Sequence, residues 1–168
     1  ESIWISYCPL PAPGAELQHL GLFNSHHRLA APVEPWARLK IGAGTPPVLT
    51  RYGWLVIYHG LGEVADRAQA LHHLRHSAGV MMLSREYPRE IRYRSAEPIL
   101  SPSLPEEQSG TVADVVFPTG IDRRTDLGSP NRFDVYYGMA DDRIGVARLD
   151  LPDALPTGGV GAEPKEKV

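Results

Sequence analysis

The sequence predicts an all-β fold built from short strands joined by many turns. Glycine and proline each occur 16 times in 168 residues, and both interrupt long helices. Apolar residues spaced two apart, followed by a polar or aromatic pair and flanked by turn residues, recur in three segments: Ile3–Cys8, Leu55–Gly60 and Phe133–Gly138. This period of two is typical of strands, so a sheet is expected at each of these places.

A second strand is expected after two of these segments. Gly79–Leu83 follows the second and Ile144–Leu149 follows the third, so each unit is predicted to be a hairpin within a small sheet. Val112–Phe117 adds another strand, which Pro118 is expected to end. Repeated small sheets are typical of a β-propeller, although this spacing leaves a sandwich open.

Helix and domain signals are sparse. The best helix candidate is Glu63–His76, in which a few apolar residues have partly helical spacing. Residues 1–151 are expected to form one domain, and the polar, Gly/Pro-rich residues 152–168 a flexible tail. Because Glu1 leads directly into strand-like sequence, we expect the chain to be the C-terminal portion of a longer protein.

Charge and cysteine content limit the function classes. The formal net charge of -3 argues against a nucleic-acid or membrane-surface partner, each of which favours a basic face. No apolar run approaches the ~18 residues that would span a bilayer. The single cysteine, Cys8, cannot form an internal disulfide, which fits a reducing compartment. We therefore expect a cytoplasmic protein.

An anion site is predicted around Lys40 and His59. Lys40 opens a segment rich in glycine and proline, and a strand that ends in Tyr-His-Gly follows it. If that strand alternates sides, His59 lies on the same side as Leu55 and Ile57, and the preceding loop can bring Lys40 close. Two cationic donors at one cleft would attract an anion.

Five motifs occur in the order in which glycoside hydrolase family 130 has them in its C-terminal half, and together they cover about residues 1–151. The family contains the mannoside phosphorylases and related β-mannosidases, and the resemblance rests on these motifs: Lys40–Gly44 with Pro46-Pro47, Gly53–Gly60, Tyr93–Ser95 with Glu97–Leu100, Val115–Gly120, and Tyr136–Asp141.

The resemblance implies a five-bladed β-propeller, of which this chain is about half. It implies inverting phosphorolysis of a β-mannoside, which gives α-mannose 1-phosphate with inorganic phosphate as co-substrate and no cofactor or metal. Lys40 and His59 align with the phosphate ligands of the family. Asp141 aligns with a ligand of sugar hydroxyls, and Phe117 with an aromatic that packs on a sugar face.

The catalytic acid is expected outside the chain. In the family this acid is an aspartate of the N-terminal half, upstream of Glu1, so the isolated chain is expected to be inactive. Two alternatives stay open. One is β-mannoside hydrolysis, which the basic pair argues against. The other is a non-catalytic carbohydrate-binding or structural propeller fragment, whose exposed blade edges would favour association with itself or with a complementary chain.

Each candidate residue also has a simpler interpretation. Lys40 could be a solvated lysine, His59 a hydrogen-bonded structural histidine and Asp141 a turn residue. Among His72, His73 and His76, two imidazoles could share one helical face. Metal binding is not favoured, because no third ligand accompanies them. The chain departs from the family pattern at a set of places that leave substrate preference open: His76 in place of tyrosine, Tyr87 in place of aspartate, Asp114 in place of asparagine, and the inserted-looking loop Asp122–Asn131.

Overall fold

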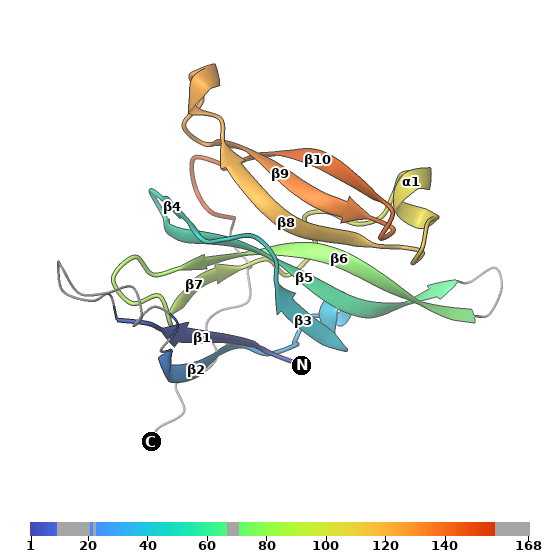
Figure 1. The fold of residues 1–168 in the computed structure, drawn as a ribbon, viewed down its shortest axis with the longest axis horizontal. Helices are drawn as coiled ribbons and strands as arrows, with labels where there is room; N and C mark the ends of the chain where they lie inside the picture. Colours follow the sequence, from blue (N-terminus) through green and yellow to red (C-terminus); the bar gives the residue numbers. More distant parts are fainter. Residues whose placement is uncertain (10–20, 22, 67–70, 157–168) are drawn as a thin grey trace.

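A computed structural model describes residues 1–9, 21, 23–66 and 71–156 of the chain, which form three stacked β-layers (Figure 1). The prediction of an all-β fold is confirmed, because the only α-helix among the described residues, α1, has four residues. The elements in chain order are β1 (Ile3–Tyr7), β2 (Asn24–Ala30), η2 (Pro35–Ala37), β3 (Lys40–Ala43), β4 (Val48–Thr50), β5 (Gly53–Asp66), β6 (Leu71–Leu83), β7 (Ile91–Arg94), α1 (Pro105–Gln108), β8 (Val116–Arg123), η3 (Thr125–Leu127), β9 (Arg132–Met139) and β10 (Arg143–Asp150).

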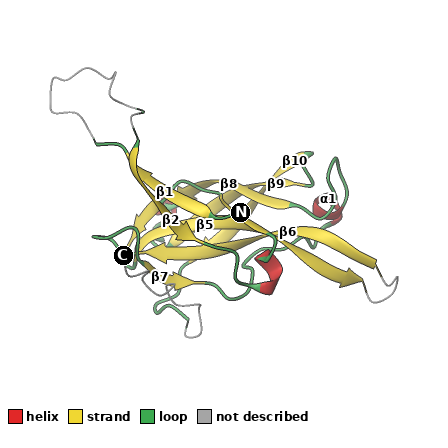
Figure 2. Ribbon diagram, turned by 90° about the horizontal axis from the view of Figure 1, so that it is seen from below, coloured by secondary structure: helices red, strands yellow, loops and turns green. Residues whose placement is uncertain are grey.

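The long β5–β6 hairpin is the centre of the fold. Its antiparallel register runs from the Trp54–Leu83 pair to the Asp66–Leu71 pair, and β3, β4 and β7 complete a five-stranded sheet around it. One end of the hairpin extends past its neighbours (Figure 2). The predicted helix over Glu63–His76 is wrong, since Glu63–Asp66 and Leu71–His76 are paired strand residues at this end of the hairpin, and residues 67–70 lie outside the described part of the chain. Continuation of an established strand ladder overrides the weak helical spacing of a few apolar residues.

Both faces of the central sheet are buried. Leu55 and Ile57 point toward the β8–β10 sheet and pack in clusters that include Phe133 and Val135. The alternate residues Val56 and Tyr58 face the other way and pack in the cluster that contains Ile3 and Ala30 of the β1–β2 sheet. This alternation is that of a regular strand, and it makes β5 the core element of the molecule.

Three glycines make room for Trp36 of η2 against the central sheet. A Cβ on Gly60 would lie 2.7 Å from the Trp36 ring, and one on Gly62 would lie 2.4 Å from the Trp36 carbonyl oxygen. Gly79 is as tight, at 2.7 Å from the ring. The indole Nε1 donates a hydrogen bond of 3.0 Å to the Ala96 carbonyl. These contacts hold η2 flat on the sheet, directly before β3 begins.

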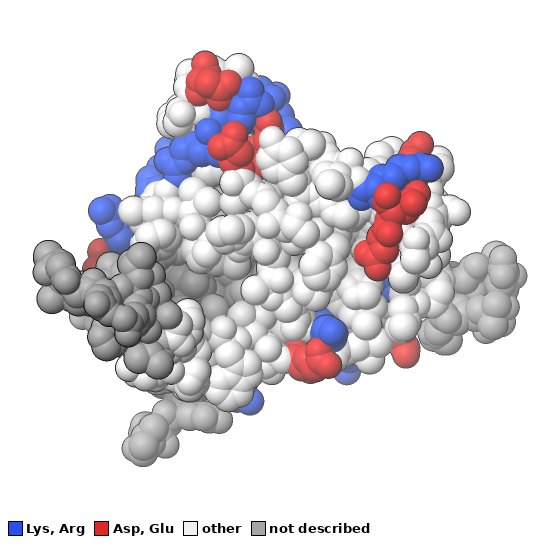
Figure 3. Space-filling model, viewed as in Figure 1, with Lys and Arg blue, Asp and Glu red and all other residues white. Residues whose placement is uncertain are grey.

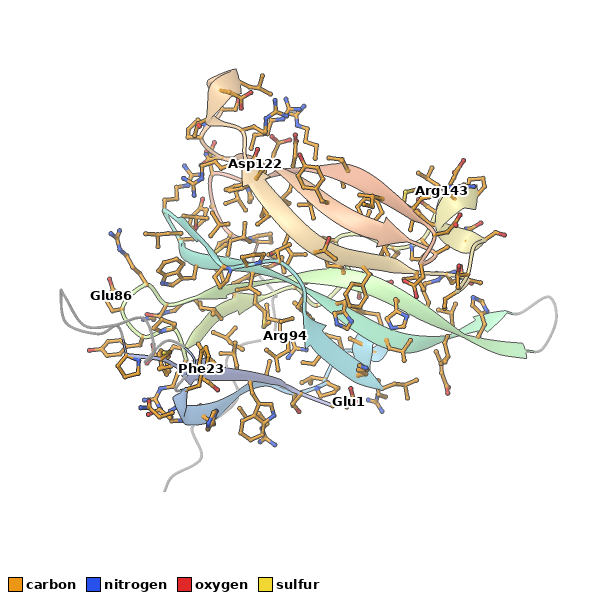
Figure 4. The ribbon with its side chains drawn as sticks, in the orientation of Figure 1. Glu1, Phe23, Glu86, Arg94, Asp122 and Arg143 are labelled. Atoms are coloured by element: carbon orange, nitrogen blue, oxygen red, sulfur yellow. The ribbon has the colours of Figure 1, made fainter. Side chains whose placement is uncertain are left out.

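A buried arginine joins the segment that follows β2 to the central sheet. The Arg94 guanidinium donates to Glu34 Oε2 at 2.5 Å and to the Ala31 carbonyl at 2.8 Å. Its Nε donates to the Tyr58 hydroxyl at 3.2 Å. Arg94 lies between the two layers (Figure 4), and its side chain and that of Glu34 are 3% and 2% exposed. The pair is therefore a structural link in the core.

The third layer is the sheet β10–β9–β8. The predicted end of a strand at Pro118 is wrong, because β8 begins at Val116 and continues through Pro118 to Arg123. Proline is tolerated here since β8 is an edge strand of its sheet, with a register shift between Pro118 and Gly120. The predicted loop Asp122–Asn131 accordingly begins inside β8 and contains η3.

Charged side chains of both signs gather at the η3 end of this sheet (Figure 3). Arg124 pairs with Asp126 at 2.8 Å and also with Asp134. Arg51 donates to the Pro152 carbonyl at 2.7 Å and to Asp153 at 3.1 Å. Residues 157–168 of the predicted tail lie outside the described residues. No helix within the described part of the chain has the length and apolar character needed to cross a membrane.

Candidate functional site

Strand register brings Lys40 and His59 to one face of the central sheet. Gly42 pairs with His59 and Lys40 pairs with Leu61, so both side chains point to the side that Leu55 and Ile57 share. Lys40 is thus the first residue of strand β3, where a loop was predicted. The arrangement confirms that Lys40 and His59 are neighbours on one face.

The His59 ring is enclosed between two elements. Its exposed fraction is 6%, and the Phe117 ring lies 4.2 Å away between centroids at an angle of 35°. A Cβ at Gly42 would lie 2.2 Å from His59 Nε2, so only glycine leaves room for the imidazole there. His59 Nδ1 is buried and has no hydrogen-bond partner among the described residues. A buried polar atom without a hydrogen bond destabilises the folded state, which suggests that this atom has a partner when a ligand is bound.

His59 is neutral near pH 7, contrary to the expectation of a cationic donor. Burial, together with the nearby His76 and Lys40, lowers its pKa to about 4. The imidazole consequently offers one N–H and one lone pair, and Lys40 supplies the fixed positive charge. A dianion placed beside both groups would favour protonation of the ring.

His76 is part of the same cluster, although the sequence did not predict it as an anion ligand. It lies on β6 opposite Leu61, with its ring 6.1 Å from His59 and 6.4 Å from Phe117. Its backbone N–H donates to the Asp114 carbonyl at 2.9 Å. Burial lowers its pKa, Asp141 opposes this effect, and Lys40 adds to it. Pairing of β5 with β6, which the helix prediction had hidden, places the two imidazoles together.

Lys40 forms an ion pair with Glu1 at the edge of the sheet. Lys40 Nζ lies 3.0 Å from Glu1 Oε2, and the lysine side chain is 42% exposed. The hydrogen bond and charge of Lys40 lower the pKa of the Glu1 carboxyl. An exposed ion pair of this kind holds its partners weakly, so an anion can compete with Glu1 for the ammonium group.

Asp141 lies in the β9–β10 turn, beside the start of β8. Both central residues of the turn, Ala140 and Asp141, have positive φ, at 49° and 52°, and the Asp142 N–H donates to the Met139 carbonyl at 3.0 Å. Aspartate tolerates this left-handed region better than most residues. The Ala140 N–H donates to the Val115 carbonyl at 3.0 Å, which fixes the turn against the segment that carries Phe117. Asp141 is thus exposed and held in place by the turn, and its negative charge acts to raise the pKa of His76.

Glu107 is a structural carboxylate. It accepts hydrogen bonds from the backbone N–H groups of Ser103 and Leu104, at 2.7 and 2.9 Å, and from the Tyr137 hydroxyl at 2.7 Å. Although burial opposes it, this set of donors holds the Glu107 pKa below its usual range. Burial and the Glu107 carboxylate raise the pKa of Tyr137 to about 12. Glu107 therefore stays ionised and fully engaged, which does not suit a proton donor.

No group of three potential metal ligands occurs in the part of the chain that the structure describes. His73 is paired with Asp114, with 3.4 Å between its Nε2 and the carboxylate. His59, His76 and Phe117 contact one another through ring faces and edges. Together with the adjacent Lys40, this environment favours an anion over a metal ion.

The low pKa of His59 predicts a specific loss of stability in acid. The ordinary value is 6.5 and the folded value is about 4, so the unfolded state binds the proton first as the pH falls. The free energy of unfolding should therefore be highest above pH 6.5 and should decrease between pH 6.5 and 4, by up to about 3 kcal/mol from this group. Urea unfolding of the complete protein at several pH values measures the decrease.

The matched variants are His59→Gln and His26→Gln. His59→Gln removes the buried imidazole and should flatten the pH dependence of the free energy of unfolding. His26→Gln is the control: it changes a histidine of β2 whose ring contacts the Ser6 hydroxyl, and it should keep that pH dependence. An equally steep pH dependence in His59→Gln would contradict the assignment of this acid sensitivity to His59.

Comparison with known proteins identifies the family. Residues 18–156 match the family model of glycoside hydrolase family 130, which is described as beta-1,4-mannooligosaccharide phosphorylase. Over 133 residues the chain is 32% identical to the beta-1,4-mannooligosaccharide phosphorylase of Ruminococcus albus, which covers 79% of this chain and 37% of that protein. It is 35% identical over 129 residues to a 1,2-beta-oligomannan phosphorylase of a Thermoanaerobacter species, covering 76% of this chain and 39% of the relative.

Solved structures agree with the sequence relatives. The complex of Listeria innocua beta-1,2-mannobiose phosphorylase with beta-1,2-mannobiose matches with a TM-score of 0.62 and 28% identity, over 76% of this chain and 33% of that one. The chain spans less than two-fifths of the length of these relatives. Because the family match extends over most of its residues, the chain belongs to glycoside hydrolase family 130.

Proposed function

We propose that the complete protein is an inverting phosphorylase that cleaves β-mannosides with inorganic phosphate and releases α-mannose 1-phosphate. The phosphorylase names of the relatives support the reaction class. The single observation that carries the proposal is the buried His59 Nδ1, which has no partner among the described residues and lies on the same sheet face as Lys40. A phosphate oxygen would satisfy that atom and would meet a fixed positive charge beside it.

In this proposal, phosphate takes the place that water has in an inverting hydrolase. The Lys40 ammonium binds one oxygen of the dianion and leaves Glu1, while the His59 ring donates an N–H to another. The enclosure of His59 by Phe117 and Gly42 excludes water from one side, which strengthens these charge-assisted bonds.

Asp141 and Phe117 are proposed to bind the sugar. The exposed Asp141 carboxylate can accept hydrogen bonds from two adjacent hydroxyl groups, and a ring such as that of Phe117 can pack against the apolar face of a pyranose. The rigid turn that presents Asp141 limits the entropy lost when the sugar is ordered.

The proton donor and the remainder of the fold are proposed to lie outside this chain. The Glu107 carboxylate accepts hydrogen bonds from two backbone N–H groups and the Tyr137 hydroxyl, and acting as the acid would require it to lose those that hold the start of α1. We further propose that the three sheets belong to a five-bladed β-propeller that the rest of the protein completes, that the isolated chain is inactive, and that the protein is cytoplasmic. Hydrolysis with water in place of phosphate is the competing activity.

The products of the reaction distinguish phosphorolysis from hydrolysis. The complete protein is incubated with β-1,4- or β-1,2-mannobiose, with and without phosphate, and mannose 1-phosphate and mannose are quantified. We expect mannose 1-phosphate to form only in the presence of phosphate. If mannobiose is hydrolysed to two mannose molecules as fast without phosphate as with it, the protein is a hydrolase. If no β-mannoside is cleaved under either condition, both activities are refuted.

Asp141→Asn tests the sugar role in the same assay. Asparagine also adopts positive φ, so the turn is kept while the carboxylate charge is lost. Loss of a charged hydrogen-bond acceptor costs about 2 kcal/mol, and the KM for the mannoside should rise about 30-fold with little change in the KM for phosphate. Asp142→Asn, at the next exposed position, is the control and should leave both constants unchanged. Equal KM values for the mannoside in Asp141→Asn and the control would contradict the assignment.

A further inference from the structure

The imidazole of His76 lies beside His59 and Phe117 in the candidate anion site, and no structural role follows from these contacts. Its ring lies 6.1 Å from the ring of His59 and 6.4 Å from that of Phe117, and it is partly exposed. His59 is nearly fully enclosed, so His76 is the more accessible imidazole of the pair. Because the two rings are 6.1 Å apart, an anion bound at the orphaned His59 Nδ1 would lie close to His76 as well.

The charged and titratable groups that face His76 come from every element packed against it. β5 contributes His59, β3 contributes Lys40 and the β9–β10 turn contributes Asp141. The segment before β8 contributes Asp114, whose carbonyl accepts from the His76 backbone and whose carboxylate pairs with His73. Asp141 thus favours a proton on His76, whereas Lys40 and a charged His59 disfavour one.

We propose that His76 is a third basic ligand of the phosphate site, and that the His59–His76 pair takes up one proton when the dianion binds. This inference rests on the proposed phosphorylase function and adds a residue and a proton to it. The proton comes from solvent and resides on either ring, because the two rings act as one coupled acid. No covalent bond forms or breaks in this step.

The physical reason is the change of charge at the centre of the cluster. Without an anion, burial and the Lys40 ammonium oppose a proton on either histidine. His76 also opposes one on His59, whereas Asp141 favours one on His76. A dianion at Lys40 reverses the sign of the local field. A proton taken up with the ion makes affinity depend on pH, by up to about tenfold per pH unit for one linked proton.

The chemistry of the imidazole gives the inference its specificity. A tyrosine at position 76 would keep an aromatic ring and a hydrogen-bond donor. A phenol is a neutral donor at physiological pH, whereas an imidazole can become a cation there. The chain's own residue therefore adds a proton-linked interaction that a tyrosine at the same position would lack.

Sulfate is the probe for the test, because it remains a dianion over the range in which phosphate itself titrates. Binding of sulfate to the complete protein is measured by calorimetry between about pH 6 and 8. Repeating the titration in buffers of different ionisation enthalpy gives the number of protons taken up. For the unmodified protein we expect affinity to rise as the pH falls, by about fivefold per pH unit, with close to one proton bound per ion.

Three variants assign the proton. His76→Gln and His76→Tyr should reduce the pH slope and the proton uptake by more than half, and His76→Tyr should still bind sulfate at the higher pH through its hydroxyl. His73→Gln, three residues away on the same strand and paired with Asp114, is the matched control and should keep the full slope. An unchanged slope in both His76 variants, or no proton uptake in the unmodified protein, overturns the inference.

Failure of this inference can be told apart from failure of the proposed function. If the unmodified protein forms mannose 1-phosphate and sulfate competes with phosphate, the phosphorylase function holds whatever the pH slope. If neither anion binds at millimolar concentration and no mannose 1-phosphate forms, the function itself fails and the His76 proposal fails with it.

Discussion

Lys40→Gln in the complete protein is expected to raise the KM for phosphate about 30-fold, with a much smaller effect on the KM for the mannoside. Lys40 is the permanent cation beside His59, and loss of one charge-assisted hydrogen bond to a dianion costs about 2 kcal/mol. His59→Gln should act in the same direction, since it removes the enclosed donor. Initial rates at varied phosphate and fixed mannoside measure both effects.

Two further variants separate the phosphate role of Lys40 from a general loss of positive charge. Arg38→Gln removes an exposed cation just before β3 and should leave the KM for phosphate unchanged. Glu1→Gln removes the carboxylate that lies 3.0 Å from Lys40 Nζ, and should leave phosphate binding equal or tighter. If Lys40→Gln and His59→Gln both keep the original KM for phosphate, neither residue binds it.

Arg94→Met is expected to destabilise the protein by about 3–5 kcal/mol, the usual cost of breaking a buried ion pair. The side chains of Arg94 and Glu34 are 3% and 2% exposed, and Glu34 Oε1 is already buried without a partner among the described residues. Methionine keeps much of the volume but leaves the Glu34 carboxylate uncompensated. Thermal and urea unfolding should show a fall in Tm of roughly 10 °C.

The neighbouring strand position supplies the control. Arg92 lies two residues away on β7 and pairs with Glu90 at 3.1 Å, but these side chains are 56% and 37% exposed. Arg92→Met should therefore cost less than about 1 kcal/mol. The double variant Arg94→Met with Glu34→Gln should recover part of the stability, because no buried charge is left. Equal destabilisation by Arg92→Met and Arg94→Met would contradict the structural role given to the buried pair.

Local patterns in the sequence were sufficient to predict the strands that form the core. The alternation in Leu55–Gly60 and in Phe133–Gly138 predicted β5 and β9, and the following apolar runs predicted their partners β6 and β10. These predictions are confirmed. β5 and β9 carry many of the buried side chains, and β10 shows the same period of two as an alternation of exposed and half-buried residues. The same alternation correctly placed His59 on the side of Leu55 and Ile57.

Two segments differ from the sequence prediction. The spacing of apolar residues predicted a helix over residues 63–76, but residues 63–66 and 71–76 are paired strand residues of β5 and β6, where hydrogen bonds to the partner strand decide the conformation. Pro118 was read as the end of a strand, but it occupies an edge position that needs no N–H for the ladder. In both cases pairing with the neighbouring strand, and not the local spacing of residue types, decides the conformation.

The sequence by itself determined the all-β class, the central strands, the family and the residues Lys40, His59, Phe117 and Asp141 as candidates. Only the tertiary structure decided how they meet: Gly42 opposite His59 leaves room for the ring, Phe117 covers it, and His76 joins from the paired strand. The reason is physical. Alternation along a strand is a local property of the chain, whereas register, burial and the resulting pKa of an imidazole depend on which strands lie beside it.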